Sequence, residues 1–299
     1  VLGRPGATPK RPAIYDEKAD GQQQVAAALA KAKKENRRVL IQWGANWCSW
    51  CHLLHDCFTQ HPEVKKKLAY EYDLVLLDIG RHDKHTDLAA KYGADLKKNG
   101  VPFLTVLDAD GNVLANQETG SLEVVPSEAA PTPAHDPKKV LDFLTKHQAS
   151  YPQAEAVIQA GLTQAKGSGK NVLLHFGAPW CGWCHKLEAW MARPEIAPIL
   201  AKDFIDVKID QDRTLGAEAV LKRYNPIAKG GIPWMVILSP EGQPLATSNG
   251  PEGNIGFPAA PQEIKHFAAM LNASKKSLTD ADITALEASL TAIAAPPRK

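Results

Sequence analysis

The hexapeptide Trp180-Cys181-Gly182-Trp183-Cys184-His185 holds two cysteines in a C-x-x-C spacing. The apolar run Val-Leu-Leu-His-Phe precedes it at residues 172–176, and the helix-like run Lys-Leu-Glu-Ala-Trp-Met follows at residues 186–191. A strand that leads into C-x-x-C and then into a helix puts the first cysteine at a helix N-terminus, where backbone N–H groups and the helix dipole stabilise a thiolate. The stretch therefore predicts a dithiol that opens and closes a small disulfide ring.

A second copy of the motif lies in the first half of the chain. Trp47-Cys48-Ser49-Trp50-Cys51-His52 follows an apolar run at residues 39–43. Later features repeat at a nearly constant separation of about 130 residues. An apolar run with the pattern of a buried central strand occurs at residues 74–79 and again at 204–209. A proline step follows in each half, Val101-Pro102 and Ile232-Pro233, and then a turn at residues 108–111 and 238–242. A register kept over several elements indicates an internal duplication.

Composition narrows the class of protein. The chain has 299 residues, 23% of them charged and 44% hydrophobic, and a formal net charge of +2. This length predicts about two domains of an ordinary soluble protein. The small charge argues against nucleic acid or a membrane surface as partner, and no apolar run approaches the roughly 20 residues of a membrane-spanning helix. Four of the five cysteines lie in C-x-x-C pairs, which indicates redox or metal chemistry.

The repeat divides the chain into four predicted segments. A Pro- and Gly-rich extended tail covers residues 1–19, two similar domains cover 20–148 and 149–272, and a C-terminal helix and tail cover 273–299. Strands that alternate with helices in each domain indicate an α/β fold, a mixed central sheet with helices on both faces. The helix expected at residues 280–294 has one apolar face, which we expect to pack on the second domain.

In this order of elements both halves resemble the thioredoxin superfamily. The succession strand, W-C-x-x-C, helix, strand, helix, x-Pro, hairpin and helix matches over roughly residues 20–148 and 152–272. The halves look most similar to bacterial thioredoxin-like thiol–disulfide oxidoreductases, and the tandem arrangement is similar in outline to protein disulfide isomerases with two active domains. The resemblance implies two tandem thioredoxin-like domains and a reductase or isomerase of protein disulfides.

The resemblance also implies roles for the cysteines. Cys48 and Cys181 match the exposed nucleophile, and Cys51 and Cys184 match the buried resolving cysteine. The nucleophile would attack a substrate disulfide, and the resolving cysteine would release the substrate from the mixed disulfide. The redox-active cysteine pairs would do this chemistry themselves, so no cofactor and no metal is expected.

Prolines and tryptophans near the cysteines match further family positions. The steps Val101-Pro102 and Ile232-Pro233 match the cis-proline that faces the disulfide and presents backbone to a peptide substrate. Cis bonds occur almost only before proline, which fits this reading. Trp47 and Trp180 match the tryptophan beside the nucleophile. The remaining supporting candidates are Trp50, His52, Trp183 and His185.

Two positions behind the cysteines depart from the family pattern. Thioredoxins usually have a buried aspartate six residues before the nucleophile, where this chain has Gln42 and His175. His175 could relay protons or be satisfied within the core, whereas Gln42 could only hydrogen-bond or hold a water. The residues between the cysteines are uncharged, so the thiol pKa would be lowered mainly by the helix N-terminus, aided by His52 and His185. We therefore expect two dithiol sites that are not equivalent.

Three alternatives stay open from the residues alone. Cys48, Cys51, His52 and His55 could ligate zinc. Each motif also satisfies C-x-x-C-H, the attachment pattern of c-type haem, so a dihaem electron carrier is a second alternative. A thioredoxin-fold chaperone or adaptor that makes little use of its cysteines is the third. The fifth cysteine, Cys57, is interpreted as an inert core residue.

The expected partners are disulfide-containing protein substrates and a thiol electron donor or acceptor whose identity the sequence does not give. We expect no nucleic acid partner. Because the chain starts at Val1 without a methionine, we expect that a signal peptide was removed and that the protein is periplasmic or otherwise exported. A cytoplasmic reductase is the alternative.

Overall fold

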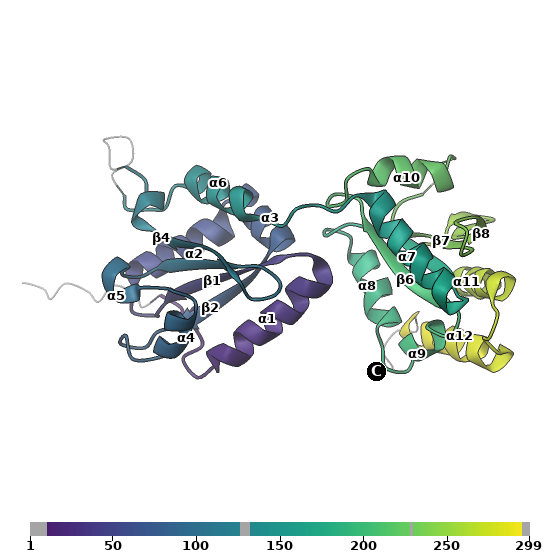
Figure 1. The fold of residues 1–299 in the computed structure, drawn as a ribbon, viewed down its shortest axis with the longest axis horizontal. Helices are drawn as coiled ribbons and strands as arrows, with labels where there is room; N and C mark the ends of the chain where they lie inside the picture. Colours follow the sequence, from purple (N-terminus) through teal and green to yellow (C-terminus); the bar gives the residue numbers. More distant parts are fainter. Residues whose placement is uncertain (1–10, 126–131, 228–229, 295–299) are drawn as a thin grey trace, which may run out of the picture. The chain divides into compact units, whose positions relative to one another are not determined.

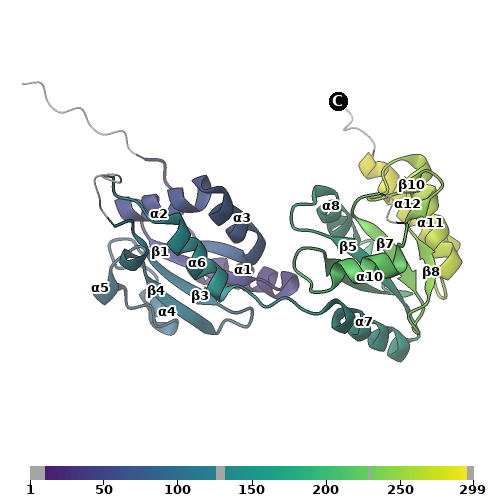
Figure 2. The ribbon, with the colours of Figure 1, turned by 90° about the horizontal axis from the view of Figure 1, so that it is seen from above.

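The computed structural model describes residues 11–125, 132–227 and 230–294. The chain forms two compact units, Val1–Ser150 (unit 1) and Tyr151–Lys299 (unit 2). Each unit contains a four-stranded mixed sheet with helices on both faces (Figure 1; Figure 2). The predicted α/β fold class with mixed central sheets is therefore confirmed. Within these described ranges, no helix has the length and apolar character needed to cross a membrane.

Unit 1 is organised around its first strand. Its elements are α1 (Gly21–Glu35), β1 (Arg38–Gly44), α2 (Ser49–Gln60), α3 (Pro62–Glu71), β2 (Tyr72–Asp78), α4 (Thr86–Lys91), α5 (Leu96–Asn99), β3 (Phe103–Leu107), β4 (Val113–Glu118), a 3₁₀ turn (Gly120–Leu122) and α6 (Pro137–His147). The strand order is β2-β1-β3-β4, with β1 parallel to β2 and antiparallel to β3. Ile41 faces the core under α1 and α4, and Leu40 faces the core under α2, α3 and α6. Because side chains alternate along a strand, Gln42 lies on the face of Leu40, beneath α2.

Unit 2 repeats this plan. Its elements are α7 (Ala154–Ser168), β5 (Asn171–Gly177), α8 (Gly182–Met191), α9 (Ala197–Leu200), β6 (Phe204–Asp210), α10 (Ala217–Tyr224), β7 (Trp234–Leu238), β8 (Pro244–Thr247), β9 (Asn249–Gly250), β10 (Gly253–Asn254), α11 (Pro261–Ser274) and α12 (Asp280–Ala294). The strand order is β6-β5-β7-β8. Leu174 faces the core under α7 and α10, and Leu173 faces the core that α8, α11 and α12 cover. His175 therefore lies on the same face as Leu173.

Helix α12 covers the residues expected for the C-terminal helix and packs within unit 2. Ile283, Leu286 and Leu290 are buried in the core that also holds the apolar face of α11. The turn before α12 is fixed by Asp203, whose carboxylate accepts hydrogen bonds of 2.7–2.9 Å from the backbone N–H groups of residues 276–278. Apolar burial and this carboxylate together attach the helix to the sheet.

The apolar runs at residues 74–79 and 204–209 supply β2 and β6, but the prediction that these are central strands is wrong. Both strands lie at an edge of their sheet, each with a single neighbour, β1 or β5. Helices α1 and α3 both contact β2, so its side chains are buried although one edge is open. An apolar run reports that both faces are covered, and it does not report how many strands lie beside it.

The extended tail predicted at residues 1–19 lies only partly within the described chain. Residues 1–10 lie outside the described part of the chain. Residues 11–20, here called the N-terminal strap, contain no helix or strand. Within the strap, Tyr15 is only 3% exposed and packs beside Cys48 and Cys51. Tyr15 therefore anchors the strap to unit 1, whereas the other residues of the strap are exposed or half-buried.

Candidate dithiol active sites

Each unit holds its cysteine pair at the start of the helix that follows the first strand. Cys48 and Cys51 form a disulfide (site 1), as do Cys181 and Cys184 (site 2), with Cα–Cα separations of 5.3 and 5.2 Å. The first cysteine is the N-cap of its helix, and its Sγ accepts a hydrogen bond of 3.1 Å from the N–H of the second cysteine in both sites. A sulfur in this position receives the partial positive charge of the helix N-terminus, which favours its thiolate when the disulfide opens.

The proline step of each unit lies against the first cysteine. The carbonyl oxygen of Val101 is 3.6 Å from Cys48 Sγ, and the carbonyl oxygen of Ile232 is 3.6 Å from Cys181 Sγ. The peptide bond from each of these residues to the following proline is cis. The fold thus brings together cysteines and proline steps that are far apart in the sequence.

The cysteines differ in access to solvent. Cys48 and Cys181 keep 6% and 4% of their surface exposed, whereas Cys51 and Cys184 keep 0% and 1%. A partner that approaches from solvent therefore meets the first cysteine of each pair. Cys57 is a residue of α2 whose side chain is buried in the core, and burial raises the pKa of its thiol to about 11. The structure places Cys57 outside site 1.

The outer tryptophans stand beside the first cysteines with different charges near their rings. Trp47 is 47% exposed and Trp180 is 61% exposed. The Trp47 Nε1–H donates to the carbonyl of Gly80 (2.7 Å), and the Arg81 guanidinium lies 5.7 Å from the ring centroid. The Trp180 Nε1–H donates to the Asp212 carboxylate (3.0 Å). The apolar platform therefore has a cation beside it in site 1 and a carboxylate in site 2.

The inner tryptophans pack on partners that the sequence did not identify. Trp50 meets the buried ring of His135 edge-on, with ring centroids 5.4 Å apart. Burial lowers the pKa of His135 to about 4. The equivalent Trp183 stacks on Phe257 at 6.1 Å, and the Lys186 ammonium lies 4.0 Å from the Trp183 ring. His135 lies just before α6, and Phe257 lies just before α11. The two residues therefore hold similar places in the two halves, but aligning the halves gives only a weak indication that they contact the tryptophans.

The histidines after the C-x-x-C motifs bind backbone. His52 is buried, and its Nε2 lies 2.9 Å from the carbonyl oxygen of Asn46. His185 is exposed, and its Nε2 lies 2.9 Å from the carbonyl oxygen of Pro179. Each ring therefore braces the loop that carries the first cysteine. Their predicted help in lowering the thiol pKa stays a prediction.

Behind site 1, Gln42 contacts the resolving cysteine. Its side chain is 0% exposed, and its Nε2–H group donates to the Cys51 carbonyl (3.1 Å) and to the Tyr15 hydroxyl (2.6 Å). The sequence placed Gln42 behind the disulfide, and its partner Tyr15 was missed. Tyr15 lies in a segment without periodicity, so no sequence pattern points to its burial.

Behind site 2, His175 and Glu188 each pair with a charged residue of β6. The His175 Nε2 lies 3.1 Å from the Asp206 carboxylate on the edge strand β6. Glu188 and Cys184 both approach Gly177, because a Cβ built on this glycine would lie 3.5 Å from Cys184 Sγ and 3.6 Å from Glu188 Oε1. Glu188 pairs with the Lys208 ammonium at 2.7 Å. Sequence reasoning missed Glu188, although a carboxylate one helical turn after the resolving cysteine is visible in the motif.

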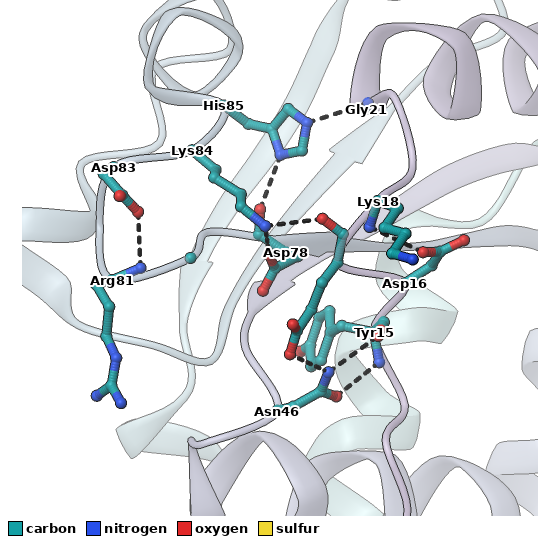
Figure 3. Close-up of polar contacts among 12 residues, drawn as sticks. Tyr15, Asp16, Lys18, Gly21, Asn46, Asp78, Arg81, Asp83, Lys84 and His85 are labelled. Atoms are coloured by element: carbon teal, nitrogen blue, oxygen red, sulfur yellow. Dashed lines mark hydrogen bonds and ion pairs between the residues drawn. The ribbon is translucent and has the colours of Figure 1, made fainter.

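Asn46, which precedes the motif, binds the backbone of the strap (Figure 3). The Asn46 Oδ1 accepts the N–H groups of Ile14 and Tyr15 at 2.9 and 3.0 Å, and its Nδ2–H group donates to the Tyr15 carbonyl at 3.0 Å. Burial raises the pKa of the Tyr15 hydroxyl, so it stays protonated at neutral pH. An uncharged hydroxyl therefore lies inside site 1.

The described ranges contain no cluster of ligands for the zinc site considered as an alternative. There, no group of three or more His, Cys, Asp or Glu side chains has the arrangement of a metal site. The set Cys48, Cys51, His52 and His55 is therefore not gathered as ligands. The two cysteine sulfurs are bonded to each other, and the His52 ring is directed to backbone.

Comparison with known families decides the class of protein. Residues 20–109 match the family model described as Thioredoxin-like. Residues 138–290, half of the chain, match the model Thioredox_DsbH, described as Protein of unknown function, DUF255. The chain belongs to the thioredoxin superfamily.

Curated relatives within the thioredoxin superfamily carry the name disulfide isomerase. Protein disulfide-isomerase tigA of Aspergillus niger is 28% identical over 177 residues, 58% of this chain and 43% of the relative. Protein disulfide-isomerase erp38 of Neurospora crassa is 25% identical over 191 residues, 62% of this chain and 47% of the relative. The chain thus spans less than half the length of these relatives. Among solved structures, a disulphide isomerase from Xylella fastidiosa Temecula1 is 30% identical, covering 44% of this chain and 95% of that chain, with a TM-score of 0.38.

Proposed function

We propose that the chain is a thiol–disulfide oxidoreductase that reduces or isomerises disulfides of protein substrates at two dithiol sites. The observation that carries the proposal is the sulfur of each first cysteine. It sits at a helix N-terminus, 3.6 Å from the carbonyl before the cis-proline, with a buried second cysteine bonded to it. The names of the curated relatives support isomerisation as the reaction.

The chemistry at site 1 would run in two exchanges. The Cys48 thiolate attacks a substrate disulfide: a bond forms between Cys48 Sγ and one substrate sulfur, and the other sulfur leaves as a thiolate that takes a proton from solvent. Cys51 then loses its proton and attacks Cys48 Sγ, which forms the Cys48–Cys51 disulfide and releases the second substrate sulfur as a thiolate. The substrate gains two electrons and the site loses two. Cys181 and Cys184 would act in the same way at site 2.

Isomerisation uses the first exchange alone. A substrate thiolate attacks the mixed disulfide, so Cys48 is restored and the substrate keeps its number of disulfides. The backbone beside each cis-proline would then hold the substrate peptide, and the outer tryptophans would contact its side chains. The cysteine pairs carry the electrons, so the proposal needs no bound cofactor.

We also infer the partners and the compartment from this chemistry. A thiol donor or acceptor must reset each pair after a net reduction or oxidation. Substrate disulfides persist in oxidising compartments, which supports an exported protein, with a cytoplasmic reductase as the alternative. The redox state of both pairs in fractionated cells would distinguish the two compartments.

Refolding of scrambled ribonuclease, run beside insulin reduction, tests the function. We expect the wild-type chain to restore ribonuclease activity, Cys48→Ser and Cys181→Ser each to lose one site's share, and the double variant to lose all of it. Cys57→Ser is the matched control, because Cys57 lies outside the sites, and it should match the wild type. Absence of both activities from the wild type, together with suppression of aggregation, would favour the chaperone or adaptor alternative and overturn the enzyme.

A further inference from the structure

The N-terminal strap packs against the sulfurs of site 1, and the described residues of unit 2 include no counterpart of it against the sulfurs of site 2. The apolar cluster around Cys48 and Cys51 contains Tyr15, with Ile14 packed against it, both from the N-terminal strap. The described cluster around the site 2 cysteines contains Ala178 and Ile232 and no residue that precedes α7. Tyr151, which precedes α7, lies against Arg213 instead.

The strap is held at several points along its length. Arg11 pairs with Asp56 on α2 at 2.7 Å, and Asn46 binds the backbone on both sides of Tyr15. Further on, the Lys84 ammonium donates to the carbonyl of Glu17 at 2.8 Å (Figure 3). These contacts hold the backbone before and after Tyr15, and the Tyr15 side chain occupies a buried place in unit 1.

That place is beside the resolving sulfur. A Cβ built on Gly44 would overlap both the Tyr15 hydroxyl and Cys51 Sγ, so the two groups meet at this glycine. The Gln42 Nε2–H group reaches both the Tyr15 hydroxyl (2.6 Å) and the Cys51 carbonyl (3.1 Å). Tyr15, Gln42 and the first turn of α2 therefore form one buried hydrogen-bonded unit.

The charges around this unit leave the hydroxyl as a neutral donor. The Tyr15 oxygen accepts from Gln42 and keeps its own hydrogen, and burial raises its pKa, with the Asp78 carboxylate adding to the rise. Asp78 is itself paired with Lys84 at 2.8 Å, and the Glu17 carboxylate accepts from Asn46 at 2.9 Å. The strands β1 and β3 and the proline step add no charged side chain at the sulfur. His52, from α2, is turned to the Asn46 carbonyl.

We propose that Tyr15 is a positioning residue of site 1: through Gln42 it fixes the first turn of α2, and its hydroxyl favours the thiolate of Cys51 when the disulfide opens. This rests on the proposed function, in which Cys51 must lose a proton before it attacks Cys48 Sγ. Tyr15 keeps its proton throughout. A donor beside a thiolate stabilises the charged form, whereas site 2 has the Glu188 carboxylate in the corresponding place.

The pH profile of Cys51 alkylation tests the proposal. The full chain carries Cys48→Ser, Cys57→Ala, Cys181→Ser and Cys184→Ser, so Cys51 is its single cysteine. We expect Tyr15→Phe, which keeps the ring, to raise the midpoint of the iodoacetamide profile by about one pH unit, a tenfold slower alkylation at neutral pH. Tyr151→Phe in the same background is the matched control and should leave the midpoint in place.

A second variant keeps the test decisive. Gln42→Leu breaks the link between Tyr15 and α2, so it should raise the midpoint alike, and the double variant should add little. Three results would each overturn the role of Tyr15: an unchanged midpoint in folded Tyr15→Phe, an equal shift with Tyr151→Phe, or fully additive shifts of Tyr15→Phe and Gln42→Leu. If Tyr15→Phe fails to fold, the midpoint of Gln42→Leu decides. The profile needs no protein substrate. An inactive wild-type chain with the shift present would thus overturn the proposed function alone.

Discussion

Site 1 and site 2 share one sulfur frame and the same tryptophans and histidine within the motif, and they differ in the side chains that surround it. The Cα–Cα separations, the N-cap contact and the contact with the carbonyl before the cis-proline agree to within 0.1 Å. Against this frame, Tyr15 stands beside the resolving sulfur of site 1, and Glu188 beside that of site 2. The frame depends on backbone, which the duplication preserved, whereas the chemistry behind it depends on side chains, which diverged.

Because of these side chains, we expect the two cysteine pairs to differ in thiol pKa and in reactivity. A neutral hydroxyl favours a thiolate and a nearby carboxylate disfavours it. A lower thiol pKa also changes how well the sulfur attacks and leaves. Substitutions at the paired positions test this difference.

The largest effect is expected from Gly44→Ala. The new methyl group would overlap Tyr15 and Cys51 in a packed core, so we expect unit 1 to lose about 3 kcal/mol of unfolding free energy. Gly182→Ala is the matched control, because no atom apart from its chain neighbours and the backbone of its own helix lies within 4 Å of its Cβ position at the start of α8. Hydrogen exchange followed by mass spectrometry separates the two units. If the backbone amides of unit 1 are equally protected from exchange in both variants, the strap moves aside for the new methyl group without loss of stability.

The next effect concerns acid and His135. Burial lowers the pKa of His135 from 6.5 to about 4 in the folded state. The unfolded chain therefore binds more protons between these values, and unit 1 should lose stability as the pH falls through this window, by on the order of 2 kcal/mol. His135→Phe gives site 1 the residue type that Phe257 provides in site 2, and it should remove this loss. Thermal unfolding near pH 7 and near pH 4 measures it.

The matched control for this change is His61→Phe, because His61 is exposed. This variant should keep the acid sensitivity of the wild type. If His135→Phe loses as much stability in acid as the wild type, the sensitivity of unit 1 arises from other groups.

The sequence predicted the frame well because each part of it leaves a local pattern. C-x-x-C between a strand and a helix, and a proline at the start of a strand, are readable from a few residues each, and the duplication doubled the signal. The position of β2 at a sheet edge was not readable, because helices on both faces make an edge strand as apolar as a central one.

The surroundings of the sulfurs were predicted less well because they are set by contacts between distant segments. Tyr15 lies in a strap without periodicity and is recognisable only through Asn46 and Gln42. His175 was expected either to relay protons or to be satisfied in the core, and its ring meets Asp206 because β5 pairs in parallel with β6. Such partners follow from strand register, which a single sequence does not reveal.

A smaller effect is expected from Glu188→Gln at site 2. The change removes a negative charge beside Cys184 and frees the Lys208 ammonium, so the thiolate should be favoured and the alkylation midpoint of Cys184 should fall by about one pH unit. The measurement uses a chain in which Cys184 is the single cysteine. The matched control is His55→Gln at the equivalent position of site 1, measured in a chain in which Cys51 is the single cysteine. Because this change removes no carboxylate, it should not lower the alkylation midpoint of Cys51. A midpoint of Cys184 that rises or stays would show that Glu188 does not act on the sulfur.

The smallest effect is expected at the outer tryptophans, where exposed charges are screened by solvent. Arg81 lies beside Trp47, and Asp212 accepts from Trp180. Arg81→Gln should slow the reduction of an anionic disulfide such as dithiodiglycolate at site 1 about twofold, and Asp212→Asn should slow that of cationic cystamine at site 2 by a similar factor. Each rate is measured at low and at high salt, in a chain whose other site has both cysteines replaced by serine. Because high salt screens such charges, both effects should vanish there; a loss that is equal for both probes would instead indicate a change in the tryptophan itself.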